Sequence, residues 1–127
     1  MKSVFPYVQR GDRYYPTVDV AVKNRRRSIT VKALIDSGAS FSVFRQEIAE
    51  HLGIVIEKGK SLYLEGVGGR ILGYAHPIQL AVGGKKFICP IVFSKEFSVS
   101  LNLLGRETFF QHFRITFDEK IKVVELE

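Results

Sequence analysis

The stretch Ala33-Leu34-Ile35-Asp36-Ser37-Gly38-Ala39-Ser40 places a carboxylate directly after an apolar segment and just before a glycine. The apolar residues predict a strand that runs into a core, and the Asp-Ser-Gly that follows predicts a loop. A carboxylate at such a position is costly unless it is hydrogen-bonded, paired or used in chemistry. Taken alone, Asp36-Ser37-Gly38 is short and common, and it favours an Asx-type turn.

The segments around this stretch predict a protein built from short strands. Apolar and polar residues alternate from Tyr14 to Lys23, and β-branched residues follow from Ser28 to Ile35, so these two segments predict a hairpin. Gly83-Gly84 is a good two-residue turn between two further predicted strands, residues 71–82 and 85–93. The remaining predicted strands cover residues 61–64, 99–104, 113–117 and 121–126.

Only two segments predict helices. Apolar residues at helical spacing between Phe44 and Leu52 predict the first, with Ser42 available as its N-cap and Gly53 where it stops. A second, shorter helix is predicted over Glu107–His112. Many short strands, glycine-bearing turns and one or two short helices together indicate an all-β, barrel-like domain.

The composition predicts one compact domain over residues 1–127. Of the 127 residues, 46% are hydrophobic and 25% are charged, which argues against a disordered or fibrous protein. No stretch approaches the ~20 apolar residues that a membrane-spanning helix needs, and the first residues lack the apolar part of a signal peptide. The single cysteine, Cys89, fits a reducing compartment. We therefore expect a cytoplasmic protein with no membrane contact.

The positive charge is concentrated in one run. The formal net charge is +6, and residues 23–27 read Lys-Asn-Arg-Arg-Arg. Because the run lies between two predicted strands, a solvated hairpin tip is the simpler interpretation, and a phosphate contact is the alternative. No nucleic-acid-binding motif accompanies the run, so no nucleic-acid partner is expected.

A glycine-rich segment, Gly66-Val67-Gly68-Gly69-Arg70, lies about thirty residues after the Asp-Ser-Gly loop. Position 71 is Ile rather than Gly and no helix follows, which argues against a dinucleotide-binding loop. Two interpretations remain, a plain mobile turn and a flap that covers a substrate. In a flap, the glycines would let the tip open and close, and Val67 would line a side-chain pocket.

Three motifs in this order resemble the retropepsin-like aspartic proteases. Residues 34–40 resemble the active-site loop of that family, and residues 66–70 fall where the family carries its flap. Leu103-Leu104-Gly105-Arg106 resembles the second signature of the family, which braces the catalytic loop. The resemblance covers residues from about 14 to 126. It implies a single-lobe, closed β-barrel of the acid protease fold, and an aspartic endopeptidase with Asp36 as its catalytic carboxylate.

The same resemblance assigns further site residues. Four residues would support the catalytic loop: Ser37, Gly38, Ala39 and Ser40. Among them, Ser37 would orient the carboxylate and Gly38 would contact the substrate backbone. Viral members of the family often have an aspartate in the place of Ser40, paired with an arginine like Arg106. Ser40 cannot form that ion pair, so Arg106 needs another partner, either Glu107 or a backbone carbonyl.

Peptide hydrolysis by this route needs two carboxylates that share one proton. The other aspartates, Asp12, Asp19 and Asp118, lie in polar or turn-like segments, so one chain supplies only one suitable carboxylate. We therefore expect a two-fold homodimer that acts on a peptide or protein substrate. Two alternatives stay open: a non-hydrolytic peptide-binding or assembly module on the same dimeric fold, and a small basic β-barrel that binds nucleic acid.

No cofactor and no metal is expected. The three histidines, His51, His76 and His112, are widely spaced and show no ligand pattern with acids or cysteine. No serine lies in a Gly-x-Ser-x-Gly sequence, so a serine hydrolase has no support either.

Overall fold

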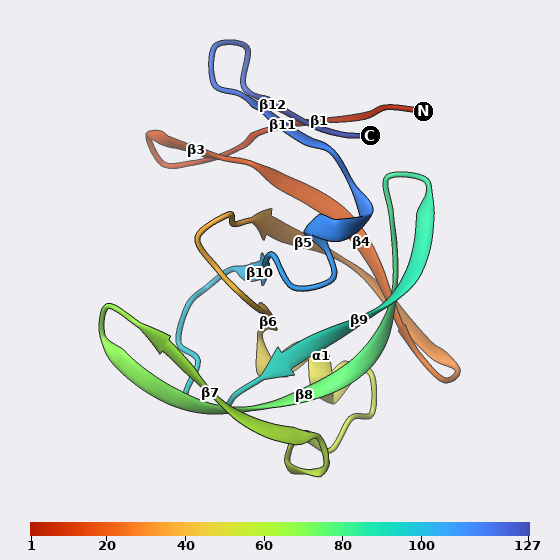
Figure 1. Cartoon of the computed structure of the whole chain (residues 1–127), viewed down its shortest axis with the longest axis vertical. Helices are drawn as coiled ribbons and strands as arrows, with labels where there is room; N and C mark the ends of the chain where they lie inside the picture. The colour runs from red at the N-terminus through yellow and green to blue at the C-terminus, as the bar shows by residue number, and fades with distance from the viewer.

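A computed structural model describes residues 1–127 and is almost entirely β (Figure 1). Strands hold 56% of the residues and helices 9%, which confirms the all-β prediction. The strands are β1 Ser3–Pro6, β2 Val8–Arg10, β3 Arg13–Tyr15, β4 Thr17–Asn24, β5 Arg27–Ile35, β6 Ser42–Phe44, β7 Lys60–Gly66, β8 Gly69–Val82, β9 Lys85–Phe93, β10 Asn102–Leu104, β11 Ile115–Asp118 and β12 Val123–Leu126. The helical elements are α1 Gln46–His51 and two 3₁₀ turns, η1 Ile56–Lys58 and η2 Phe110–His112.

The main sheet closes into a ring of six strands. Its order is β4-β5-β10-β6-β9-β8, β8 also pairs with β4 to close the ring, and β7 adds to the free part of β8. The long β8 can belong to both the ring and the hairpin, because its first half pairs with β7 and its second half with β9 and β4. The closed barrel that the sequence predicted is therefore present.

Alternation along the strands explains which side chains fill the ring. Val18, Val20 and Val22 of β4 are buried, and Ile78 and Leu80 of β8 are buried opposite them. Since successive side chains of a strand point to opposite faces, this spacing sends one apolar set inward from each strand. The resulting core contains 20 buried residues and extends to Val124 and Leu126 near the C-terminus.

The two ends of the chain form a separate three-stranded sheet. Its order is β1-β12-β11, and Ser3 of β1 faces Leu126 of β12 in antiparallel register. Figure 1 shows this sheet at the top of the molecule, away from the β7–β8 hairpin at the bottom. The predicted final hairpin is thus confirmed as β11–β12. The sequence patterns did not predict β1 or β2, and the strand predicted over Tyr14–Lys23 is divided between the end of β3 and β4.

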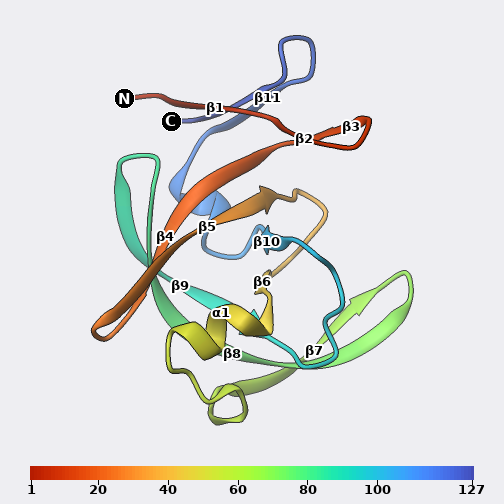
Figure 2. The same cartoon turned by 180° about the vertical axis from the view of Figure 1, so that it is seen from behind.

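The first helix starts later than predicted. Residues 42–44 form β6 instead, and α1 begins at Gln46 with Arg45 as its N-cap residue. Ser42 is therefore not the helix cap, because its hydroxyl accepts a hydrogen bond from the backbone of Gly105. The predicted end is right, since Gly53 has a φ of +69°, a conformation that favours glycine. Figure 2 shows α1 on the face that is turned away in Figure 1.

The second predicted helix, residues 107–112, is reduced to the 3₁₀ turn η2. The cause lies at its start, where Thr108 has a φ of +65°, which interrupts a right-handed helix. The strand predicted over 99–104 is likewise shortened to β10. No helix in the structure is long and apolar enough to cross a bilayer.

Candidate active site

Asp36 is the first residue after β5, and its loop is fixed by its own hydrogen bonds. The Asp36 amide donates to the carbonyl of Leu104 over 2.9 Å. Its carboxylate oxygen Oδ1 accepts from the amide of Gly38, also at 2.9 Å, and its carbonyl accepts from Ala39. The Asx-type turn is therefore present. It holds a half-buried carboxylate at the end of a core strand.

The segment after β10 holds the far end of this loop. β10 pairs in parallel with β5, so that Leu104 lies beside Ile35, immediately before Asp36. Two residues further on, the amide of Arg106 donates to the carbonyl of Ala39 at 2.9 Å. The following amide, that of Glu107, donates to the carbonyl of Ser40 at 2.7 Å. The backbone of residues 104–107 thus holds residues 36–40 at both ends.

Gly105 is at this position because nothing larger fits. A Cβ atom on Gly105 would lie 2.4 Å from the carbonyl oxygen of Phe41 and 2.8 Å from that of Ala39. The Gly105 amide donates to the Ser42 hydroxyl at 3.0 Å, which closes the contact from the other side. The backbone after β10 can approach the backbone of residues 39–41 this closely only because position 105 is a glycine.

Asn102 is a further brace that the sequence analysis missed. Its side-chain oxygen accepts from the Arg45 amide at 2.9 Å, and its nitrogen donates to the Lys32 carbonyl at 3.1 Å. It therefore links β5, β10 and the start of α1 below the Asp36 loop. The signal that could have shown it is a polar residue inside an otherwise apolar strand, because buried polar groups need partners.

A cleft of about 700 Å³ opens above the loop. Its walls are the Asp36 loop, the β7–β8 hairpin and residues 96–99. Eight of the predicted site residues line it: Asp36, Gly38, Ala39, Ser40, Gly66, Gly68, Gly69 and Leu103. Five do not: Ser37, Val67, Leu104, Gly105 and Arg106. The structure therefore brings the first two motifs together around one space, while the third lies mainly behind the loop.

The tip of the β7–β8 hairpin has open space around its glycines. Added Cβ atoms on Gly66, Gly68 or Gly69 would have no neighbour within 4 Å. Val67 is fully exposed and does not line the cleft. Gly69 has a φ of +110°, a region open essentially only to glycine.

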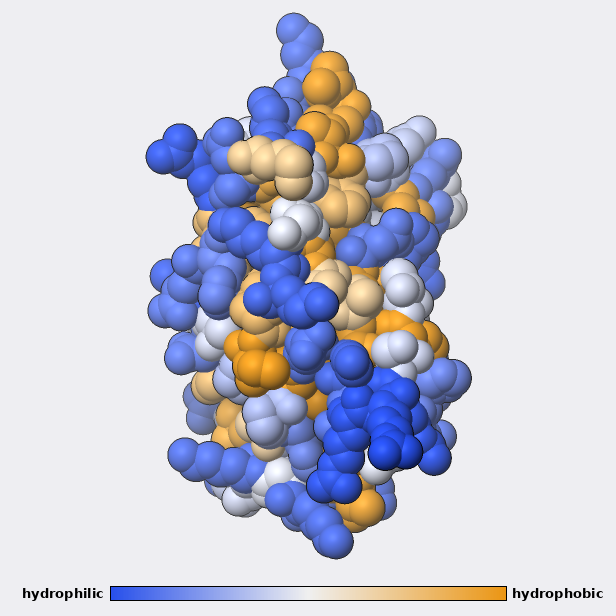
Figure 3. Space-filling model, turned by 90° about the vertical axis from the view of Figure 1, so that its right-hand side faces the viewer, coloured by the Kyte–Doolittle hydropathy of each residue, from blue (hydrophilic) through white to orange (hydrophobic).

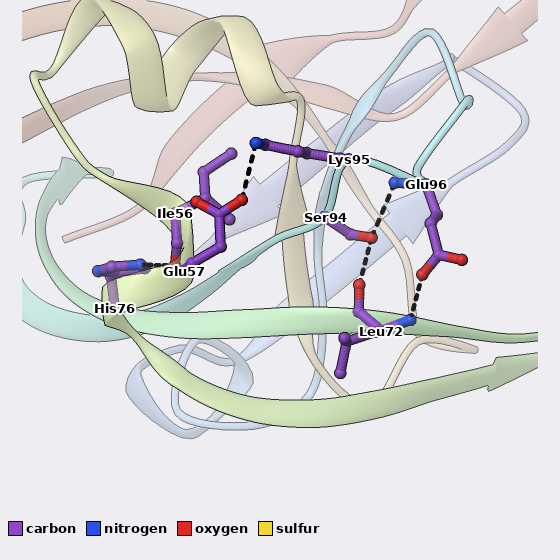
Figure 4. A network of polar contacts seen from close by, with 7 residues as sticks. All are labelled: Ile56, Glu57, Leu72, His76, Ser94, Lys95 and Glu96. Carbon is purple, nitrogen blue, oxygen red and sulfur yellow. Dashed lines mark hydrogen bonds and ion pairs between the residues drawn. The ribbon is translucent and has the colours of Figure 1, made fainter.

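The base of the same hairpin is held by side chains, as Figure 4 shows. The Leu72 amide donates to the carboxylate of Glu96 at 2.7 Å, and the Ser94 hydroxyl donates to the Leu72 carbonyl at 2.5 Å. The Glu96 amide in turn donates to the Ser94 hydroxyl at 3.1 Å. Regular pairing between β8 and β9 ends at Tyr74 and Phe93, so these groups take over where the ladder stops. We call Ser94, Glu96 and Leu72 the hairpin clamp.

Two more contacts fix η1 beside this clamp. Lys95 forms an exposed 2.7 Å ion pair with Glu57, and the hydrogen bond from Lys95 lowers the pKa of the Glu57 carboxyl. The ring of His76 donates from Nε2 to the Ile56 carbonyl at 2.8 Å. Both contacts are visible in Figure 4, and they connect η1 to β8 and to the segment after β9.

Neither Ser37 nor Arg106 has the partner expected for it. The Ser37 hydroxyl is exposed and forms no hydrogen bond within the chain, so the amide of Gly38 orients the carboxylate instead. The guanidinium of Arg106 forms no ion pair with Glu107, and it lines a shallow depression together with Ser40 and Glu107. Both side chains are available to groups outside this chain.

Cys89 is unsuited to act as a nucleophile. Its side chain is completely buried in the core. Burial raises the pKa of the Cys89 thiol to about 11, so the thiol stays protonated at neutral pH. The residue is a small apolar core residue.

Only one aspartate lies in the cleft. Asp19 pairs with Lys32 at 2.8 Å on the barrel surface, and Asp118 accepts the amides of Lys120 and Ile121 in the β11–β12 turn. Asp36 therefore has no second aspartate beside it in this chain. The other carboxylates that line the cleft are Glu65, on β7, and Glu96, which belongs to the hairpin clamp.

A closed barrel with an Asp-Ser-Gly loop braced by a Leu-Leu-Gly strand is the architecture of single-lobe acid proteases. A family model described as aspartyl protease matches residues 18–108, which include the Asp36 loop, the β7–β8 hairpin and β10. The chain therefore belongs to this aspartyl protease family of the retropepsin-like clan. A search of curated proteins finds no match.

Proposed function

We propose that the protein is an aspartic endopeptidase that acts as a homodimer, with Asp36 from each copy in one active site. The observation that carries the proposal is the single Asp36 carboxylate, which accepts from the Gly38 amide and lines a cleft that a glycine-tipped hairpin also lines. Membership of the aspartyl protease family supports peptide hydrolysis in general. The dimer follows from the chemistry, because one carboxylate cannot be both acid and base in the same step.

In the dimer, a two-fold axis would bring two identical Asp36 loops face to face. Two carboxylates about 3 Å apart cannot both ionise, so the pair keeps one proton. The ionised Asp36 takes a proton from a water molecule, and that water attacks the scissile carbonyl carbon. The protonated Asp36 donates to the carbonyl oxygen, which gives a tetrahedral gem-diol. The Asp36 that took the water proton then passes it to the amide nitrogen, and the C–N bond breaks to release the amine. The other Asp36 takes back a proton from a gem-diol hydroxyl, so the pair again holds one proton.

The cleft suits an extended peptide. The exposed backbone of the β7–β8 hairpin can pair with a substrate strand from above, and the floor presents the backbone of Gly38. We propose that this hairpin is the flap and that it closes over bound substrate to exclude water. The cleft is lined by 9 hydrophobic residues among 18, which favours apolar substrate side chains near the cleaved bond.

The decisive experiment compares Asp36→Asn with Asp19→Asn on an unbiased peptide mixture from acidic to neutral pH. We expect Asp36→Asn to reduce cleavage about 10³-fold or more while the protein stays folded, because it removes the acid–base group. Asp19→Asn is the matched control, since Asp19 lies outside the cleft. Cleavage that survives in Asp36→Asn would refute the mechanism. Peptide binding without any cleavage by the wild type would favour the non-hydrolytic module.

Subunit mixing tests the shared site. If each active site needs both carboxylates, an equal mixture of wild type and Asp36→Asn that has exchanged subunits leaves only about a quarter of the dimers fully active. We therefore expect the activity per wild-type chain to fall to about half of its value before exchange. Sedimentation at several concentrations must show a dimer in the active range. A strict monomer that cleaves peptides would contradict the shared site.

A further inference from the structure

A second cavity, of about 600 Å³, lies far from the cleft. It is bounded by the tip of the β4–β5 hairpin, by the segment 52–58 and by His76 and Pro77 of β8. In Figure 1 this hairpin tip lies on the right, on the opposite side of the molecule from the β7–β8 tip. We call this cavity the arginine pocket.

The arginine pocket is strongly positive. Four cationic side chains line it, Arg25, Arg26, Arg27 and Lys58, and no aspartate or glutamate does. None of the four takes part in an ion pair, although lysines and an arginine elsewhere in the chain form four. Figure 3, which faces this side of the molecule, shows a dense hydrophilic patch in its lower half. Four like charges that face one cavity repel one another unless an anion binds between them.

The two walls of the pocket are tied together. Asn24, at the end of β4, donates from its side chain to the Leu52 carbonyl at 3.2 Å. The guanidinium of Arg27 packs against Gly53, where an added Cβ would lie 3.2 Å from Arg27 Nη1. The Arg27 charge therefore lies at the wall that Gly53 forms.

The turn between β4 and β5 has a strained backbone, because an arginine occupies a position that favours glycine. Asn24 pairs with Arg27, so Arg25 and Arg26 form a two-residue turn, and Arg25 has a φ of +56°. Glycine and asparagine are the residues that such turns prefer, because they adopt positive φ at little cost. Backbone strain of this kind collects at functional sites. Arginine at this position thus costs stability and adds a charge to the pocket.

We propose that the arginine pocket binds a compact anion that carries two or more phosphate charges. Guanidinium groups bind phosphate oxygens through paired, charge-assisted hydrogen bonds, and arginine keeps its charge at every physiological pH. The four cations line one cavity, which favours a small polyphosphate-bearing ligand over a long nucleic-acid strand. The site is separate from the Asp36 cleft, and its occupancy does not depend on hydrolysis.

The test is calorimetric titration of the full chain with inorganic pyrophosphate, compared with a single-stranded oligonucleotide, at low and at physiological ionic strength. Two variants remove pocket charges, Arg25→Gly and Arg27→Gln, and Arg13→Gln removes an exposed charge outside the pocket. We expect each pocket variant to weaken pyrophosphate binding about tenfold, and Arg13→Gln to leave it unchanged. Arg25→Gly should also raise the melting temperature by about 3 °C, since glycine relieves the strained φ.

The rise in melting temperature is what separates loss of the site from loss of the fold. A variant that is more stable yet binds pyrophosphate less tightly has lost a binding group. Three results would overturn the proposal. They are absence of pyrophosphate binding by the wild type, equal weakening by Arg13→Gln, and much tighter binding of the oligonucleotide with a steep salt dependence, which would indicate a strand-binding surface.

Discussion

The Asp36 loop and the tip of the β7–β8 hairpin line the same cleft, yet they are built in opposite ways. The loop is held by the backbone of residues 104–107 and by its own Asx turn, and Gly105 behind it has no room for even one more carbon. At the hairpin tip Val67 is fully exposed, and the glycines have open space around them. The site thus keeps the groups proposed for chemistry fixed and leaves the proposed cover free to move.

The hairpin clamp marks the boundary between the fixed part of the site and the free hairpin tip. Below it, β8 pairs with β9 and belongs to the barrel; beyond it, only β7 accompanies β8. Leu72 is the last residue that side chains from the segment after β9 hold in place. Motion of the hairpin should therefore begin just beyond Leu72, toward the tip.

The largest expected effect comes from the same substitution made in both regions. Gly105→Ala should destabilise the fold by about 3 kcal/mol, because the new Cβ would meet the Phe41 carbonyl at 2.4 Å and two backbones would have to separate. Urea unfolding followed by circular dichroism measures the difference. Gly68→Ala is the matched control and should change the unfolding free energy by less than about 0.5 kcal/mol.

Gly105→Ala should also impair catalysis more than its effect on stability explains. The Asp36 amide donates to Leu104, the residue immediately before Gly105, so a shift there displaces the carboxylate. Assays are run well below the unfolding transition, so that the loss is measured on folded protein. Equal stability of Gly105→Ala and Gly68→Ala would show that the loop is not held as tightly as its contacts indicate.

The fixed region was also the more predictable from sequence. The Asp-Ser-Gly loop is a short local pattern whose residue types indicate a turn, whereas the bracing role of the Leu-Leu-Gly strand was implied by the resemblance to the family. The hydrogen bond from Gly105 to Ser42 joins residues 63 apart in sequence, so Ser42 was wrongly predicted as a helix cap. Glu96 and Leu72 are 24 residues apart, and no local pattern marks a carboxylate that will cap a strand amide.

Errors in the predicted secondary structure also arise from features that local sequence does not show. The predicted helix over Glu107–His112 is reduced because Thr108 takes a positive φ, which no local pattern of residue types indicated. β1 was not predicted because it exists only through pairing with β12, at the other end of the chain. Long-range pairing of this kind is invisible to a window of neighbouring residues.

An intermediate effect is expected at the clamp. Glu96→Ala removes the acceptor of the Leu72 amide and should loosen the hairpin base, raising KM about fivefold with a smaller change in kcat, because substrate must then order a looser cover. Glu96→Gln keeps a carbonyl oxygen in the same place and should restore most of the KM. Steady-state kinetics on one peptide substrate measures both.

Lys95→Ala is the control for this pair. Lys95 neighbours Glu96, but its ion pair with Glu57 is exposed, so its removal should alter KM little. If Glu96→Gln behaves like Glu96→Ala, the carboxylate acts through its charge rather than as a clamp. If none of the three variants changes KM, the hairpin base is held by the β7–β8 pairing alone.

The smallest effects should appear at the hairpin tip, where adjacent glycines differ in one respect. Gly69 has a φ of +110°, which alanine tolerates badly, whereas the φ of Gly68 is not positive and there is open space around it. Gly69→Ala should cost about 1–2 kcal/mol of local strain and lower kcat/KM severalfold.

Gly68→Ala should leave the unfolding free energy unchanged within about 0.5 kcal/mol. It should slow hairpin opening and so reduce kcat by about twofold, since alanine has fewer accessible backbone conformations than glycine. A kcat for Gly68→Ala above that of the wild type would mean that the free tip limits closure rather than opening. Ordering of the tip during closure would then be the slow step, and the stiffer alanine backbone would make that step faster.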